Sequence, residues 1–240
     1  MVAIELKKVY KKYSTQYALS DINLSIFPGS LLGLLGPNGS GKTSLFKLLL
    51  RYTQPSKGQI LFQNCPLSHS SMKQIAGFVQ GNPFPRWMRI IDAVDFYKDF
   101  FPDFDLLYCK KLLRQFDLNS KALISKLSSG NISSLKLILI LSRVGATLYL
   151  LDEPLEAMDI VTRNMFLNEI LNAFHENCAM MISTHHVEEI EHILSEVVFI
   201  RHGHIELTAN AEDLRVERNM SIVNLYWEKY VHSKLDQIRI

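Results

Sequence analysis

The chain has 240 residues, of which 48% are hydrophobic and 21% are charged, proportions that are typical of an ordinary globular protein. The net charge of +2 at pH 7 is too small to indicate a nucleic-acid partner, and we expect none. The most apolar stretch, residues 135–151, is interrupted by Lys136 and Arg143, which excludes a membrane span there. Any link to a membrane is therefore expected to run through a partner.

The three cysteines are odd in number and far apart in the sequence. Cys65, Cys109 and Cys178 form no CxxC pair, so neither a disulfide framework nor a zinc site is indicated. Reduced thiols are typical of cytosolic proteins, and this is where we expect the chain to reside.

Two kinds of strand are predicted from the polarity pattern. The early segments alternate between apolar and polar residues, and a turn at residues 27–30 joins two of them, which predicts an antiparallel β layer. Other segments are apolar throughout, as expected for parallel strands that are buried on both faces. The predicted strands cover residues 2–9, 21–26, 31–35, 59–62, 75–80, 147–151, 179–183, 197–201 and 204–207.

Residues 36–43 read GPNGSGKT and lie between an apolar strand and an apolar helical pattern that starts at Leu45. In this context the glycines let successive backbone N–H groups surround phosphates, and the start of the helix adds a positive dipole. Lys42 is expected to reach the terminal phosphates, and Thr43 to hold Mg²⁺. The chain is therefore predicted to bind a nucleoside triphosphate through Gly36, Pro37, Asn38, Gly39, Ser40, Gly41, Lys42, Thr43 and Ser44.

The predicted secondary structure changes between residues 81 and 144, from mostly strands to mostly helices. Three prolines punctuate this stretch, and helical periodicity covers residues 90–101 and 106–116, with Asp103 or Asp105 as the cap of the second helix. We predict a helical subdomain of residues 81–144, inserted into a core formed by residues 1–80 and 145–220. Residues 221–240 are expected to form a short helical or loosely held C-terminal segment.

Two carboxylates end the apolar strand Leu148-Tyr149-Leu150-Leu151. Asp152 is expected to lie beside the phosphate loop and to bind Mg²⁺ directly or through water. Glu153 is then expected to face the γ-phosphate, where a carboxylate orients an attacking water.

The motifs follow one another in the order found in the ATP-binding subunits of ABC transporters, which the chain resembles over roughly residues 3–210. They are the phosphate loop, Gln80 after a strand, the signature-like Leu127-Ser128-Ser129-Gly130-Asn131, the Asp152–Glu153 strand and Ser183-Thr184-His185. The resemblance implies an α/β fold: a P-loop NTPase core with a mostly parallel sheet, an antiparallel β layer and an inserted α-helical subdomain.

The resemblance also implies roles for single residues. Glu153, His185 and Gln80 match catalytic positions, and Gln80 joins Thr43 and Asp152 as a Mg²⁺ site. Tyr13 falls where an aromatic ring stacks on adenine, with Tyr10 and Tyr17 as rivals. In the family, signature residues grip the γ-phosphate bound to the opposite subunit, which implies this role for Ser128, Ser129 and Gly130.

The chain departs from the family pattern at three positions. The signature usually reads Leu-Ser-Gly-Gly-Gln, whereas this chain has Ser129 and Asn131. We expect the side chain of Ser129 to strain the backbone and to slow turnover. Glu156 stands where a small polar residue is typical, and its carboxylate is expected to repel the triphosphate.

The resemblance implies an ATP-hydrolysing motor subunit of a bacterial ABC transporter, with ATP and Mg²⁺ as cofactors. Its expected partners are separately encoded transmembrane permease subunits, on the cytoplasmic side of the membrane, and a second ATP-binding subunit in a homodimer or heterodimer. Phe84, Trp87 and Met88 are predicted either to dock on the permease or to fill the insert's core. Residues 96–105 are similar to segments of exporter-type subunits, which favours export of a small molecule or peptide. The alternative is a soluble, non-transport ABC-type ATPase that serves in cofactor assembly.

Overall fold

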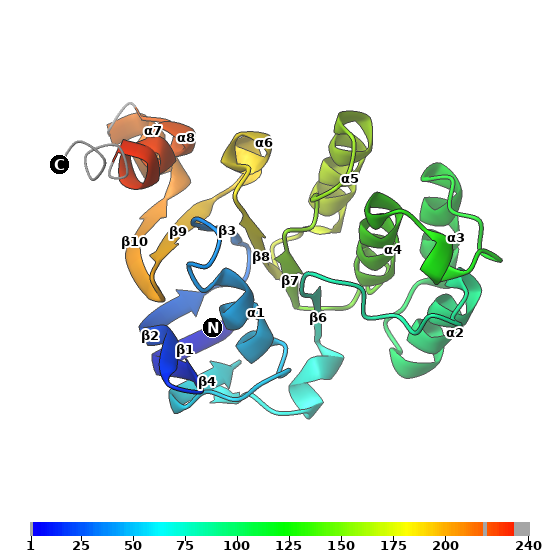
Figure 1. The fold of residues 1–240 in the computed structure, drawn as a ribbon, viewed down its shortest axis with the longest axis horizontal. Helices are drawn as coiled ribbons and strands as arrows, with labels where there is room; N and C mark the ends of the chain where they lie inside the picture. The colour runs from blue at the N-terminus through cyan, green and yellow to red at the C-terminus, as the bar shows by residue number, and fades with distance from the viewer. Residues whose placement is uncertain (1, 218–219, 233–240) are drawn as a thin grey trace.

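A computed structural model describes residues 2–217 and 220–232 (Figure 1). Its centre is a six-stranded sheet in which every neighbouring pair is parallel except the antiparallel pair β10–β9. This confirms the predicted mostly parallel sheet. The strand order is β10 (His204–Asn210), β9 (Glu196–Arg201), β3 (Leu31–Leu35), β8 (Ala179–Thr184), β7 (Leu148–Asp152) and β6 (Ile75–Phe78).

A second, antiparallel sheet forms the predicted β layer. It has the order β2 (Gln16–Ile26), β1 (Ile4–Tyr13), β4 (Lys57–Phe62) and β5 (Cys65–Pro66). The turn at residues 27–30 does not join two strands of this layer, as the sequence suggested, because it leads from β2 into β3 of the other sheet.

The six-stranded sheet is buried on both faces, which explains its apolar strands. Leu32 and Leu34 of β3 pack into a core shared with the antiparallel sheet and α1 (Lys42–Leu49). Leu31 and Leu35, on the opposite face, pack into a core shared with the remaining helices.

Three α-helices and one short 3₁₀ helix (Ile124–Lys126) occupy the stretch between residues 81 and 144: the α-helices are α2 (Ile90–Phe100), α3 (Leu106–Gln115) and α4 (Ser129–Leu141). They lie beside β6 and β7, at the side of the molecule opposite β10 (Figure 1). Asp105 caps α3, since its carboxylate accepts hydrogen bonds from the N–H groups of Leu107 and Tyr108. The exact division into domains at residues 80, 144 and 220 stays a prediction.

Asp103, the other candidate cap, binds the buried guanidinium of Arg143 instead. Arg143 donates from Nε and Nη2 to the two Asp103 carboxylate oxygens at 3.1 and 3.0 Å. It also donates to the carbonyl oxygens of Ile75, at 2.7 Å, and Lys73. Because Ile75 begins β6, Arg143 joins the end of α4 to the amino end of the sheet.

The later helices are α5 (Ile160–Ala173), α6 (Val187–Ile190), α7 (Ala211–Glu217) and α8 (Ile222–Trp227), and a π-helical turn follows at Glu228–His232. The predicted C-terminal segment is therefore helical as far as residue 232, and its remainder lies outside the described residues. Within residues 2–217 and 220–232, every helix is too short or too polar to span a bilayer.

Candidate active site

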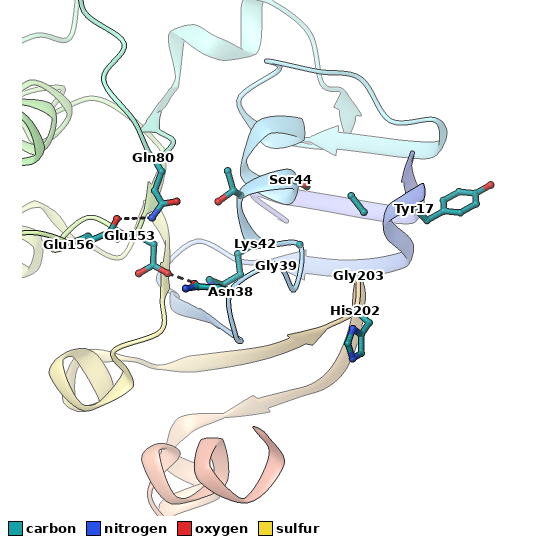
Figure 2. A pocket seen from close by; sticks show the side chains of 13 residues that line it. Tyr17, Asn38, Gly39, Lys42, Ser44, Gln80, Glu153, Glu156, His202 and Gly203 are labelled. Atoms are coloured by element: carbon teal, nitrogen blue, oxygen red, sulfur yellow. Dashed lines mark hydrogen bonds and ion pairs between the residues drawn. The ribbon is translucent and has the colours of Figure 1, made fainter. Parts of the chain in front are cut away.

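The predicted site residues converge on the carboxyl edge of the six-stranded sheet. The phosphate loop follows β3, Gln80 follows β6, Glu153 follows β7 and His185 follows β8. Ligands of open α/β sheets bind at this edge, because loops leave there and helices begin there. A cavity of about 630 Å³ opens on it (Figure 2). Its lining consists of Tyr17, Ala18, Asn38, Gly39, Gly41, Lys42, Thr43, Ser44, Gln80, Glu153, Glu156, His202 and Gly203.

The phosphate loop is held in a conformation that requires glycine. Gly41 has a φ of 114°, and a Cβ there would lie 2.8 Å from the carbonyl oxygen of Ala18. Immediately after it, Lys42 starts α1 and folds back to donate to the carbonyl oxygens of Gly36, at 2.7 Å, and Pro37, at 3.3 Å. Burial lowers the pKa of Lys42, and the carboxylates of Glu153 and Asp152 oppose that shift.

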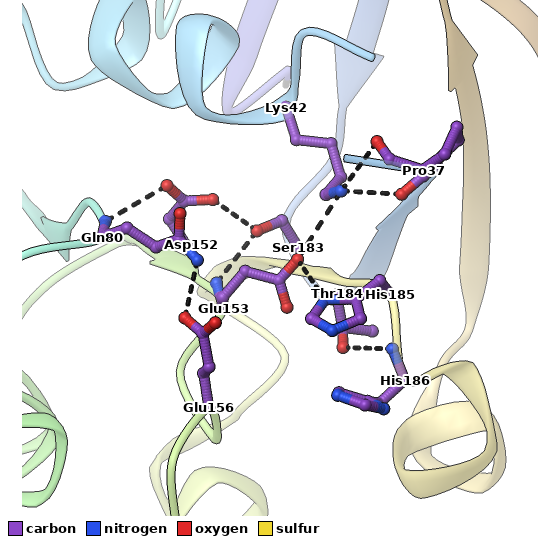
Figure 3. A network of polar contacts seen from close by, with 11 residues as sticks. Pro37, Lys42, Gln80, Asp152, Glu153, Glu156, Ser183, Thr184, His185 and His186 are labelled. Carbon is purple, nitrogen blue, oxygen red and sulfur yellow. Dashed lines mark hydrogen bonds and ion pairs between the residues drawn. The ribbon is translucent and has the colours of Figure 1, made fainter. Parts of the chain in front are cut away.

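Glu153 stands at the centre of the polar network (Figure 3). Its Oε1 lies 3.6 Å from Nζ of Lys42 and 3.0 Å from Nδ1 of His185. A carboxylate only accepts hydrogen bonds, so Nδ1 of His185 carries the proton in this contact. Glu153 adopts a left-handed backbone with φ of 48° and donates its N–H to Oγ of Ser183 at 3.0 Å. Such strained residues persist where the surroundings hold them, often at functional sites.

Asp152 is fully buried and fixed by two donors. Ser183 donates to its Oδ1 at 2.6 Å, and the N–H of Gln80 donates to its Oδ2 at 3.3 Å. The hydroxyl of Thr43, the amide oxygen of Gln80 and this carboxylate are the hard oxygen ligands that Mg²⁺ prefers. The described residues hold no cluster of three His, Cys, Asp or Glu that would bind a metal alone. The donor set therefore fits an ion that takes its other ligands from phosphate and water.

Ser40, inside the phosphate loop, has a buried hydroxyl without a hydrogen-bond partner. Ser40 is not among the residues that line the cavity, so a ligand bound there does not account for this hydroxyl.

Tyr17, and not Tyr13, lines the cavity. Figure 2 places Tyr17 at one end and Gln80 at the other, with Lys42 between them. The two rings are otherwise alike: Tyr13 is 43% exposed and Tyr17 50%, and each lies under a lysine ammonium, so the cavity lining is what separates them. An aromatic ring at the end away from Lys42 suits a base, so the geometry favours the rival Tyr17, and the assignment to Tyr13 stays a prediction.

The signature segment lies apart from this cavity, at the start of α4. Ser128 caps the helix by accepting from the N–H of Asn131 at 3.2 Å. Ser129 is the first residue of the helix and is not among the non-glycine residues with positive φ, so the expected backbone strain is absent there. Gly130 is required by packing, because a Cβ would lie 2.6 Å from the carbonyl oxygen of Ala157.

Three residues make contacts in the network that the sequence analysis did not predict. Ser183 links Asp152 to Glu153, and a serine between apolar strand residues was a usable signal. Lys136 contacts the backbone beside Gln80, and the position of a lysine within an apolar run was a second usable signal in the sequence. Glu156 accepts a hydrogen bond from Gln80, which no sequence signal indicated.

A protein-family model described as "ABC transporter" matches residues 19–156, more than half of the chain. The ABC transporter ATP-binding protein YtrB of Bacillus subtilis is 30% identical over 217 residues, which cover 89% of this chain and 74% of YtrB. The sulfate/thiosulfate import ATP-binding protein CysA of Neisseria meningitidis is also 30% identical, over 88% of this chain, but the chain spans only 62% of the length of CysA.

Solved structures confirm the fold. An ATP-binding subunit of an ABC transporter superposes with a TM-score of 0.83 at 19% identity, over 94% of this chain and 98% of that one. A dimeric ATP-binding cassette in a post-hydrolysis state, bound to ADP and Pi, gives a TM-score of 0.77 at 19% identity, over 87% and 98%. The chain therefore belongs to the ABC transporter family, as one of its ATP-binding ATPase subunits.

Proposed function

We propose that this chain is the motor subunit of a bacterial ABC transporter, in which ATP bound at the carboxyl edge of the sheet drives a membrane partner. The observation that carries the proposal is the contact of Lys42 and His185 with Oε1 of Glu153. Three residues from separate segments, each predicted from the sequence, meet at one oxygen atom. A cation, a carboxylate and an imidazole together suit the hydrolysis of a phosphate anhydride.

The residues along the cavity have different roles in this proposal. Lys42 exchanges its contacts with the Gly36 and Pro37 carbonyls for phosphate oxygens, which carry a negative charge that those carbonyls lack. Glu153 accepts a hydrogen bond from the attacking water and orients it, and His185 contacts the terminal phosphate. Thr43, Gln80 and Asp152 would hold Mg²⁺, which would supply charge neutralisation at the phosphate oxygens.

A second subunit completes the site in this proposal. Ser128, Ser129 and Asn131 are exposed at the start of α4, where the helix dipole favours an anion. The dimeric cassette described above supports such a pairing. We propose that each subunit offers this turn to the nucleotide of its partner, in a homodimer or a heterodimer.

The helical stretch is the proposed docking face for permease subunits on the cytoplasmic side of the membrane. Trp87 is 70% exposed, whereas Phe84 and Met88 pack against the core, so only Trp87 is free for docking. The rings of Phe96 and Phe100 stack on each other on α2, and both are exposed to solvent. The similarity of residues 96–105 to exporter-type subunits supports export of a small molecule or peptide, although CysA is named for import.

The test is to purify the chain from its native membranes and to measure ATP hydrolysis of the complex. We expect a polytopic membrane protein to co-purify, and Lys42→Ala to abolish hydrolysis while the complex stays assembled. Recovery with a soluble partner alone would favour the cofactor-assembly function instead.

A further inference from the structure

A second cavity of about 360 Å³ lies behind the nucleotide cavity, between the signature turn and the catalytic strand. Gln80, Glu153 and Glu156 line both cavities and therefore form the wall between them. Gln80 is the only one of the three that carries an amide, whose oxygen and nitrogen have opposite preferences: the oxygen binds cations and the nitrogen donates hydrogen bonds. Which of them faces the nucleotide cavity decides whether Gln80 is able to hold Mg²⁺.

The main chain around Gln80 is fixed on both sides. Its N–H donates to Asp152 as described above, and the ammonium of Lys136 donates to the carbonyl oxygens of Val79, at 3.4 Å, and Gly81, at 3.1 Å. Lys136 projects from α4, is buried, and lies 4.4 Å from the ring centroid of Phe78. These contacts hold the backbone of Gln80 and leave its side chain to be oriented by another group.

That group is Glu156. Nε2 of Gln80 donates to Oε2 of Glu156 at 2.6 Å. An ionised carboxylate has no proton to give, so it selects the amide nitrogen and repels the amide oxygen. Figure 3 shows the result: the nitrogen of Gln80 points to Glu156, and its oxygen points away from Glu156.

Glu156 is itself held in place by its loop. Its N–H donates to the carbonyl oxygen of Glu153 at 3.3 Å, and the next residue, Ala157, has a φ of 63°, which turns the chain sharply. The neighbouring ammonium of Lys136 faces the same second cavity, and its positive charge offsets the carboxylate of Glu156.

We propose that Glu156 is a positioning residue: its carboxylate binds the amide nitrogen of Gln80 and so presents the amide oxygen to Mg²⁺. This inference rests on the proposed function. It differs from the expectation that Glu156 repels the triphosphate, and the experiment below separates the two.

The experiment measures metal affinity separately from nucleotide affinity. Mn²⁺ replaces Mg²⁺ and is titrated by electron paramagnetic resonance into protein saturated with a non-hydrolysable ATP analogue. Glu156→Gln is the central variant, since its amide accepts or donates and no longer selects one orientation of Gln80. We expect its Mn²⁺ affinity to fall roughly tenfold or more, as it does when partners of metal ligands are replaced. Affinity for the analogue in excess chelator stays unchanged.

Three further variants sharpen the result. Glu156→Asp keeps an acceptor-only group and is expected to retain most of the Mn²⁺ affinity. Gln80→Ala removes the residue that Glu156 positions, so adding Glu156→Gln to it has no further effect. Glu176→Gln makes the same change in charge at an exposed turn before β8, at the opposite edge of the sheet, and leaves Mn²⁺ affinity as in the wild type.

Equal Mn²⁺ affinity in the wild type and Glu156→Gln would overturn the inference. So would tighter binding of the analogue without metal, since that is the result of relieved repulsion. Both outcomes leave the proposed function standing. Failure of the wild type itself to bind the analogue would overturn the proposed function and the inference together.

Discussion

The edge formed by β7 and β8 and the first turn of α4 carry motifs of the same family but differ in burial. At the edge, Asp152, Glu153 and Ser183 are buried, and each is bonded to a group of its own chain. At the first turn of α4, Ser128 and Ser129 are exposed to solvent. The difference teaches that the proposed metal-binding and catalytic carboxylates are fixed by folding, whereas the serines proposed to serve a partner's nucleotide remain on the surface. Substitutions at the edge are thus expected to impair the function of each chain, whereas substitutions at the first turn of α4 are expected to impair only the assembled complex.

The largest effect is expected at Glu153. Glu153→Gln keeps the shape of the side chain but removes the negative charge that orients water, so ATP turnover is expected to fall about 100-fold or more. ATP binding stays intact, and an ATP-bound dimer accumulates, which size-exclusion chromatography detects. Undiminished turnover would remove Glu153 from the mechanism.

The next effect concerns the end of the cavity lined by Tyr17. Tyr17→Ala is expected to weaken ATP binding by about 1–3 kcal/mol, because stacking of a base on an aromatic ring is worth that much. Tyr13→Ala is the matched control and leaves binding unchanged, since Tyr13 does not line the cavity. Calorimetric titration with ATP distinguishes them, and the reverse result would restore the assignment to Tyr13.

A smaller effect is expected at the first turn of α4. Ser128→Ala removes the side-chain cap of the helix, which is worth about 1 kcal/mol. We expect turnover of the assembled complex to fall several-fold while ATP affinity of the isolated chain is unchanged. A loss of affinity in the isolated chain would contradict the separation of the two regions.

The smallest effect is expected where the sequence departs most visibly from the family. Restoring the signature with Ser129→Gly and Asn131→Gln together relieves no strain, because Ser129 is already helical. The difference in helix propensity between serine and glycine predicts a change in turnover of about twofold. A tenfold rise in the ATPase rate of the complex would show instead that Ser129 and Asn131 limit the motor.

The sequence predicts well those features of the site that depend on local sequence patterns. Lys42, Glu153 and His185 each follow an apolar run, and parallel strands bring the residues at their carboxyl ends together, so their meeting follows from local patterns. The choice between Tyr13 and Tyr17 does not follow from local patterns, because it depends on how β1 pairs with β2, and that pairing contains register shifts. Similarly, Asp103 and Asp105 look alike as caps, and only the packing of Arg143 separates them.

The position of Arg143 has a mechanical consequence. It anchors the chain just beyond the end of α4, beside the amino end of β6, whereas Ser129 starts the same helix near the loop that follows β7. A helix of 13 residues is about 20 Å long, so a tilt of about 10° around the anchored end moves the other end by about 3 Å. The serine and glycine that a neighbouring subunit's nucleotide would meet therefore lie a full helix length from the guanidinium group that anchors the other end of α4.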